Sequence, residues 1–324
     1  MPEVVLEHPE AIKQLHHEFA RTGSDIMLAF TYYGHREKLK LIGKEDLLEP
    51  LNRQAVQIAR SVAADHPGMF VAGNICNTNV YEPGNAQSEA EVRAIFTEQL
   101  TWAEEEGIDL IVCETIAFLG EARIAVEVAK EFNKPIVLGF AVHRSGKPRD
   151  FDGSIGDACK IIRDAGADVV GVNCHRGPAT MYPLVEEIVK TVEPARVCAF
   201  PVAYRTTPDQ PTFGSLRDPD QPVPDDVPGG LPFPVALDPF VVTRYEMADF
   251  ARRCKALGVG YVGGCCGSGP HHIRAMAEAL GRTTEASLYS PDMSKHYALG
   301  TDKSLKSHNQ AYAGSLERSD SGHL

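Results

Sequence analysis

The sequence has no apolar run near the roughly 20 residues that a membrane-crossing helix needs, and it starts with neither the basic nor the apolar stretch of a secretion signal. It also has no cluster of lysine and arginine, and its formal net charge is −12. A surface that follows nucleic-acid phosphates is therefore not expected. These absences predict a soluble, cytoplasmic protein without membrane or nucleic-acid partners, whose ligands are small molecules.

The eight cysteines of this 324-residue chain are irregularly spaced. The eight cysteines include no Cys-x-x-Cys pair, which argues against a closed structural zinc site. They also do not resemble the disulfide framework of a small secreted domain. Most are expected to be small buried apolar residues, and this is the interpretation for Cys76, Cys113, Cys159, Cys198 and Cys254.

The run from Tyr261 to Gly267 contains the adjacent pair Cys265 and Cys266, which glycines flank on both sides. Adjacent thiols are badly placed for a mutual disulfide but well placed for one metal ion, and thiolates select zinc among common metals. A catalytic zinc takes three protein ligands and keeps a fourth position open. The best third ligand is Cys174, which ends a separate apolar run. These three cysteines predict a catalytic zinc site.

Short apolar runs alternate with amphipathic segments along the chain, as in the βαβ units of a parallel sheet. Seven runs are predicted to be strands: Ile26 to Tyr32, Met69 to Ile75, Leu110 to Glu114, Ile136 to Val142, Val169 to Cys174, Val197 to Tyr204 and Tyr261 to Cys265. Eight segments are predicted to be helices: 7–22, 45–65, 88–106, 118–132, 153–165, 179–191, 240–257 and 270–281. The pattern predicts an α/β fold, a (β/α)8 TIM-type barrel that lacks its first strand. The carboxyl ends of barrel strands share one rim, where the three thiols are expected to converge.

The surplus helix stands at the start of the chain, so the absent strand would precede it. A truncated or wrongly started chain accounts for this pattern, and so does family variation or another segment in the strand's place. Loss of a strand opens the core of a barrel and exposes two sheet edges.

Residues 1–282 are predicted to form the barrel domain, and residues 283–324 a polar tail that is disordered or orders on a partner. The segment 205–240 is rich in Pro, Gly and Asp and interrupts the alternation after the sixth strand. Loops of this length are usually functional or mobile. This one either covers the rim with the thiols or is a passive surface insertion.

The motifs Gly171 to Cys174, Gly263 to Gly267 and Pro270 to Ile273 resemble the homocysteine S-methyltransferase family, most closely its betaine–homocysteine branch. The similarity extends from about residue 5 to 282 and includes other matching stretches: His8 to Ala11, Gln14 to Phe19, Phe30 to Tyr33, Val71 to Gly73, Pro201 to Tyr204 and Arg244 to Gly267. The resemblance implies a zinc-dependent enzyme that transfers a methyl group from a small onium donor to the thiol of homocysteine, giving methionine. It also implies that the family's three zinc ligands are Cys174, Cys265 and Cys266.

Further site residues follow from the resemblance. Glu114 matches the family glutamate that binds the homocysteine amino group, and a carboxylate suits an ammonium in a partly desolvated pocket. Tyr81 matches the family tyrosine near the zinc, which faces the donor. Asn173 would orient the site from beside a ligand. The plainer alternative for Glu114 is an ordinary surface glutamate at a strand end. For Tyr81 it is a loop tyrosine that packs on a neighbouring residue.

The methyl donor is less well determined. In the betaine branch a tryptophan and a tyrosine help to enclose betaine, but here the sole tryptophan is Trp102 in a predicted helix, and Thr115 follows the glutamate. A cage with fewer aromatic rings binds a quaternary ammonium less well. Betaine is the first choice, and the sulfonium donors S-methylmethionine and dimethylsulfoniopropionate stay open. Three further possibilities also stay open: the acceptor is another thiol, the protein is an inactive zinc-binding scaffold, or the chain forms a homo-oligomer.

Overall fold

The computed structural model describes residues 3–218, 220, 223, 227, 230–297, 300–308, 311 and 315. The chain divides into two compact units, Met1–Glu285 and Ala286–Leu324. All strands of the described residues belong to the first unit, and the described part of the second contains the short 3-10 helix η7, Met293–Lys295. The rest of the predicted tail, at residues 298, 299, 309, 310, 312–314 and 316–324, lies outside the described residues. No described helix combines the length and the apolar character that crossing a bilayer requires.

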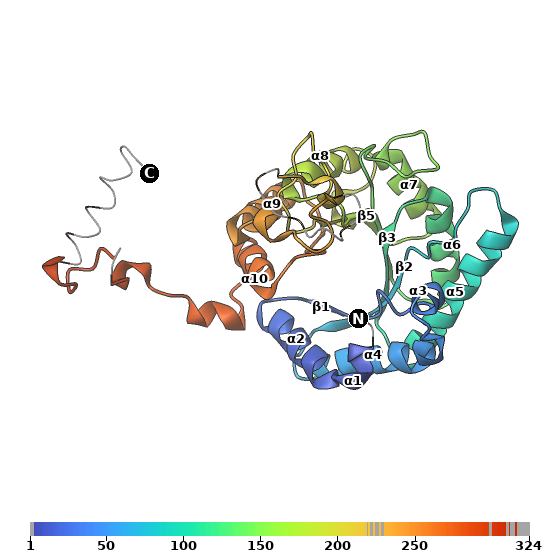
Figure 1. The fold of residues 1–324 in the computed structure, drawn as a ribbon, viewed down its shortest axis with the longest axis horizontal. Helices are drawn as coiled ribbons and strands as arrows, with labels where there is room; N and C mark the ends of the chain where they lie inside the picture. Colours follow the sequence, from blue (N-terminus) through green and yellow to red (C-terminus); the bar gives the residue numbers. More distant parts are fainter. Residues whose placement is uncertain are drawn as a thin grey trace. The chain divides into compact units, whose positions relative to one another are not determined.

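Seven strands form one parallel sheet in which each strand pairs with the next along the chain (Figure 1). The strands are β1 Ile26–Leu28, β2 Phe70–Cys76, β3 Leu110–Ile116, β4 Ile136–Phe140, β5 Val169–Asn173, β6 Val197–Phe200 and β7 Tyr261–Val262. All seven predicted strands are confirmed. The predictions at β1, β6 and β7 continued beyond the true ends, because the residues after these strands are still partly buried but belong to rim loops.

Eight helices of ten or more residues lie around the described sheet (Figure 1). They are α2 Pro9–Arg21, α4 Leu48–Ala63, α5 Ala86–Glu105, α6 Leu119–Lys130, α7 Ile155–Ala165, α8 Pro178–Ile188, α9 Arg244–Ala256 and α10 Pro270–Ala279. Two shorter helices, α1 Val4–Glu7 and α3 Arg36–Lys40, complete the α-helices of the described chain. Each long helix contacts the next along the chain, and α10 contacts α2. The helical ring is therefore closed.

The sheet inside this ring is open, because no described strand pairs with the free edges of β1 and β7. Eight helices around seven strands is the arrangement of a (β/α)8 barrel that lacks its first strand. The barrel interior shows the consequence. Its buried apolar side chains lie on the five inner strands: Ala72, Leu110, Val137, Val169 and Cys198. The edge residues Ile26, Leu28 and Tyr261 pack against them but are only partly buried.

Local sequence explains why the elements that carry the site begin and end where they do. The strands β4 and β5 are buried at every residue, because helices cover one face and the barrel interior the other. Helix α7 starts at a capping box formed by Ser154 and Asp157, and it ends at Gly166, whose φ of 124° few other residues adopt. The chain then enters β5 after two residues, which delivers Asn173 to the carboxyl rim.

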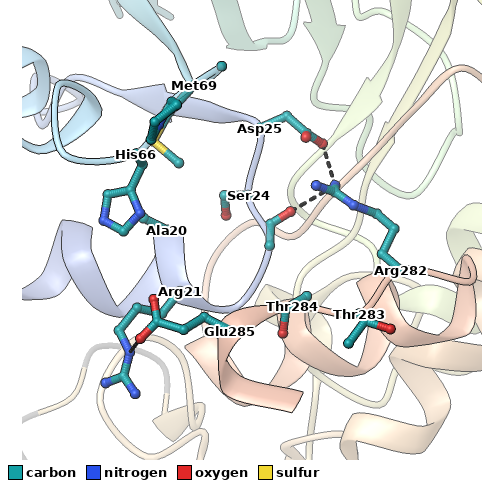
Figure 2. A pocket seen from close by; sticks show the side chains of 13 residues that line it. Ala20, Arg21, Ser24, Asp25, His66, Met69, Arg282, Thr283, Thr284 and Glu285 are labelled. Carbon is teal, nitrogen blue, oxygen red and sulfur yellow. Dashed lines mark hydrogen bonds and ion pairs between the residues drawn. The ribbon is translucent and has the colours of Figure 1, made fainter. Parts of the chain in front are cut away.

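A polar pocket of about 260 Å³ lies at the opposite end of the sheet, before the start of β1 (Figure 2). Arg282 donates hydrogen bonds to the Asp25 carboxylate at 2.6 Å and to the Gly23 carbonyl at 2.9 Å. Arg21 forms a second ion pair, with Glu285 at 3.2 Å. The charged groups that line the pocket therefore pair with one another and join the end of α10 to the start of β1. Active sites of such barrels lie at the other end.

Candidate metal centre and substrate site

Cys174 directly follows the last residue of β5 and faces the carboxyl rim. Its φ is 59° and that of the next residue, His175, is 57°. Two successive non-glycine residues in the left-handed region are uncommon, and such backbone conformations concentrate at functional sites. The Cys174 N–H donates to the carbonyl of Phe200, the last residue of β6, at 2.9 Å, so the end of β6 holds this turn in place.

Cys265 and Cys266 lie three and four residues after the end of β7. The Cys265 N–H donates to the Pro201 carbonyl at 2.8 Å, and the Ala203 N–H donates to the Cys266 carbonyl at 2.9 Å. Gly267 has a φ of 78°, and a Cβ at this position would lie 2.6 Å from the Tyr204 ring. Glycine is therefore required here both for the turn and for the close approach of the tyrosine.

The three sulfur atoms converge. Sγ of Cys266 lies 3.6 Å from Sγ of Cys174 and 4.0 Å from Sγ of Cys265, and all three lie within 4.8 Å of one another. Tetrahedral zinc with metal–sulfur bonds of about 2.3 Å would hold its sulfur ligands about 3.8 Å apart. The observed spacing fits one metal ion. Cys174 is buried and Cys266 is exposed, so the cluster is open on one side.

Hydrogen bonds among these thiols favour a negative charge in the cluster. Donation from Cys174 and Cys265 lowers the pKa of the Cys266 thiol to about 3. The pKa of Cys265 is raised instead, first because of its hydrogen bonds to Cys174 and Cys266 and then by burial. A metal ion takes thiolates as ligands, so a cluster that already favours one thiolate is prepared for it.

Asn173 connects the cysteines with the neighbouring strand β3. Its side-chain amide donates to Oε2 of Glu114 at 3.4 Å and to Oγ1 of Thr115 at 3.1 Å, and it lies 3.9 Å from Sγ of Cys265. Its carbonyl oxygen accepts the Thr115 N–H at 2.8 Å. Thr115 has a φ of 61°, and this hydrogen bond is one of the contacts that hold it there. Asn173 is itself buried, so it fixes these groups relative to one another.

The Glu114 carboxylate lies on the same rim and also accepts a hydrogen bond from the Asn74 amide. Burial and the nearby Cys266 charge raise the pKa of Glu114, while Asn74 and Lys38 lower it, and the net result is a pKa of about 7. A rim carboxyl group with this pKa is a candidate binding group for a cationic substrate atom. The structure thus brings Glu114, Thr115 and Asn173 together with the cysteines.

Tyr81, which the family resemblance assigns to the neighbourhood of the metal, packs against an aromatic ring at the start of α6. Its ring centroid lies 5.4 Å from that of Phe118, and a Cβ on Gly120 would clash with its hydroxyl. Burial and then Asp150 raise its pKa. Tyr81 therefore packs beside α6, and its role toward the metal or the donor stays a prediction.

Three other tyrosines are close enough to feel the cysteine charges. Burial raises the pKa of Tyr32, Tyr33 and Tyr204, and charges at Cys174 and Cys266 raise all three further. The signal for Tyr32 and Tyr33 was present in the sequence, because both stand at the end of a predicted strand at the same rim. The predicted strand includes Tyr32 and stops before Tyr33, whereas the observed strand ends at Leu28 and both tyrosines belong to the loop after it.

Part of the long loop 205–240 covers the cluster. Phe213, Leu216 and Leu237 form a buried apolar cluster with Cys174, and Cys265 packs against it. The Phe213 N–H donates to the carbonyl of His175 at 2.7 Å. Residues 219, 221, 222, 224–226, 228 and 229 of this loop lie outside the described residues. Of the two interpretations left open by the sequence, the described contacts favour a cover over a passive insertion.

A parallel β/α barrel with three thiols converging at the carboxyl rim has the architecture of a barrel metalloenzyme. Among the described residues this is the one group of three or more ligating side chains close enough to hold a metal ion. The family model for homocysteine S-methyltransferase matches residues 2–280. The chain belongs to the homocysteine S-methyltransferase family and is a methyltransferase.

Individual relatives agree with this assignment. The chain is 35% identical to betaine–homocysteine S-methyltransferase 1 of Xenopus tropicalis, over 98% of this chain and 76% of that protein. It is 33% identical to the S-methylmethionine–homocysteine S-methyltransferase BHMT2 of Pongo abelii, over 93% of this chain and 77% of that protein. The metallated form of the homocysteine methyltransferase MmuM from Escherichia coli is similar in fold, with a TM-score of 0.64, 16% identity and coverage of 85% and 86% of the two chains.

The cluster predicts that metal binding needs all three thiols. Replacing Cys174, Cys265 or Cys266 by Ala should reduce the metal content from about one ion per chain to a small fraction, because two thiolates do not make a three-ligand site. Plasma emission spectrometry on purified protein measures this content. Cys254→Ala, in the buried face of α9, is the matched control and should keep its metal. Full metal content in any of the three variants would exclude that residue as a ligand.

The raised pKa of Glu114 predicts a pH-dependent cost to stability. Because its pKa in the folded chain exceeds the ordinary 4.5, the folded state loses stability as pH rises from about 4.5 to about 7. Glu114→Gln removes the ionisation. With both proteins metal-free, the Tm of the variant should therefore exceed that of wild type by about 2–6 °C at pH 8, and by less at pH 5. The exposed Glu91→Gln is the control. A difference in Tm that does not change with pH would contradict the assignment.

Proposed function

We propose that this chain transfers a methyl group from a small onium donor to the thiol of homocysteine and forms methionine, with a zinc ion held by Cys174, Cys265 and Cys266. The observation that carries the proposal is the convergence of these sulfur atoms at spacings of 3.6 and 4.0 Å. Zinc bound there would supply one chemical effect, which is to favour the thiolate form of a sulfur ligand at neutral pH. Zinc also suits a site made only of sulfur ligands.

The residues beside the cysteines suit the acceptor. Glu114 presents a carboxylate on the same rim, and Asn173 contacts both this carboxylate and Cys265. We assign Glu114 to the homocysteine ammonium, since a charge-assisted hydrogen bond in a partly buried cleft is strong. Binding of the ammonium would compensate the burial of the carboxylate. Through its contacts with Glu114 and Cys265, Asn173 would then fix the distance between the binding sites for the amino group and the sulfur of the acceptor.

The donor has a methyl group on a cationic nitrogen or sulfur. In the transfer the acceptor sulfur forms a bond to the methyl carbon, the bond between that carbon and the cationic atom breaks, and the electron pair stays with the donor, which leaves uncharged at that atom. No proton moves to the leaving group, so no general acid is required. The protein must chiefly hold the two substrates in line, and such orientation supplies up to about 7–11 kcal/mol of a barrier.

Betaine is our first choice of donor, and a sulfonium compound is the second candidate. Both choices have support from relatives of similar identity, whose names specify betaine and S-methylmethionine. The observation that favours a sulfonium donor is Thr115, which is buried and hydrogen-bonded to Asn173 where the betaine branch places an aromatic ring. A cage with one ring fewer weakens binding of a quaternary ammonium.

The proposal predicts methionine formation by the zinc-loaded chain from homocysteine and one of three donors offered separately: betaine, S-methylmethionine or dimethylsulfoniopropionate. Mass spectrometry of the product measures the rate, and Cys174→Ala is the inactive control. Turnover with betaine above the others would support the first choice. Turnover with a different thiol but not homocysteine would replace the acceptor. If the zinc-loaded protein forms no methionine with any donor, the result would favour the inactive scaffold.

The placement of the tyrosines gives a second prediction. Tyr33 is 55% exposed and lies near the cysteine charges, while Tyr81 packs on Phe118. If Tyr33 binds the onium group, Tyr33→Ala should raise the KM for the donor about 2- to 30-fold, the size of a cation–π contact, and leave the KM for homocysteine near its wild-type value. Tyr81→Ala should change neither by more than about 2-fold. A larger increase in the KM for the donor with Tyr81→Ala than with Tyr33→Ala would place Tyr81 in the donor site instead.

A further inference from the structure

Lys38 in α3 places its ammonium on the aromatic corner made by Tyr32 and Tyr33. Nζ lies 3.8 Å from the centroid of the Tyr32 ring and 5.3 Å from that of Tyr33, and the two rings meet edge to face at 5.0 Å. Nζ also donates to the Tyr32 carbonyl at 2.8 Å and to Sγ of Cys76 at 3.2 Å. An ammonium has three donors, and these contacts use two of them.

This charge lies beside the substrate site. Cys76, which accepts from Lys38, is the register partner of Glu114 on the adjacent strand. The lysine charge also lowers the pKa of Glu114. Lys38 forms no ion pair with a described carboxylate within 4.0 Å, so its charge is not neutralised by a close partner. The site therefore contains a fixed positive charge on the same aromatic rings that would receive a cationic donor.

A donor that carries only a positive charge would be repelled by this ammonium. A zwitterionic donor has a carboxylate a few bonds from its onium group, and this carboxylate can take the third N–H of Lys38. The onium group can then contact the exposed face of Tyr33. The homocysteine carboxylate has the same chemistry, but its amino group is assigned to Glu114 and its sulfur to the cysteine cluster, whereas Lys38 lies on the tyrosines.

We propose that Lys38 is a specificity-determining residue that binds the carboxylate of a zwitterionic methyl donor and rejects donors that are only cationic. This inference rests on the proposed function and extends it, because it names the charge pattern that the donor must have. The tyrosine rings would bind the onium group whatever the rest of the molecule. Lys38 would decide which onium compounds are retained.

The test compares donors that differ at the carboxylate: betaine with choline, in which a hydroxymethyl group replaces it, and dimethylsulfoniopropionate with ethyldimethylsulfonium, in which hydrogen replaces it. Lys38→Met keeps the length of the side chain and removes the charge, and Lys38→Arg keeps the charge. Lys40→Met, an exposed change on the same helix, is the matched control. Kd values for each donor come from calorimetry of the zinc-loaded protein with homocysteine bound, and kcat/KM is measured for every donor that reacts.

Wild type should bind the zwitterion of each pair more tightly. Lys38→Met should weaken its binding about 10- to 100-fold, as for loss of one charge-assisted hydrogen bond, and should leave the cation-only donor unchanged or more tightly bound. Lys38→Arg should retain most of the preference, and Lys40→Met all of it. Equal loss for both members of a pair would show a merely structural role and overturn the proposal.

Two further outcomes separate the possible failures. A Lys38→Met protein that loses affinity for homocysteine but not for 3-mercaptopropylamine, which lacks the carboxylate, would assign the lysine to the acceptor and overturn the inference. Absence of turnover with every donor would contradict the proposed function. The binding comparison would still decide the inference, since no preference of wild type for either zwitterion over its matched cation would overturn it.

Discussion

One short segment, Phe200 to Ala203, holds the two halves of the cysteine cluster together. The Phe200 carbonyl accepts from the N–H of Cys174, the Pro201 carbonyl accepts from Cys265, and the Ala203 N–H donates to Cys266. This segment continues β6, which lies between β5 and β7 in the sheet. Cys174 and the adjacent pair Cys265 and Cys266 are far apart in the sequence, with 92 positions between Cys174 and Cys266. They can meet because parallel strands end at the same rim and the strand between them supplies backbone partners to both sides.

The buried amide of Asn173 extends this arrangement to β3. It joins Glu114, Thr115 and Cys265 through short contacts, and three rim residues near it have left-handed backbone: Thr115, Cys174 and His175. Such conformations cost energy, and the surrounding hydrogen bonds maintain them. The loop residues Phe213, Leu216 and Leu237 cover the cluster from above the rim. The site is therefore rigid on the side of the strands and partly shielded from water on the side of the loop.

Charge divides this rim into two regions. The cysteine cluster favours a negative charge on Cys266, and Glu114 is a carboxyl group beside it. This region would suit a cationic atom of a substrate. Lys38 contributes a positive charge next to them, held by the rings of Tyr32 and the exposed Tyr33. If the donor binds here as proposed, such a rim would select zwitterions, because each charge of the ligand would find its complement and a simple ion would meet one repulsive group. At the other end of the barrel, the ion pairs of Arg21 and Arg282 only connect elements.

The sequence by itself determined the alternation of strands and helices, the absence of one strand, and the three cysteines, because apolar periodicity and an adjacent cysteine pair are local signals. It also determined Glu114 and Asn173 as rim residues, since both stand at the ends of apolar runs. Only the tertiary structure decided that Tyr32 and Tyr33 lie near the sulfur atoms, because the end of an apolar strand and the buried rim loop after it look alike in the sequence. The structure also decided the position of Lys38. Its partners come from a different strand and loop, and no spacing in the chain predicts that an ammonium will stack on two rings.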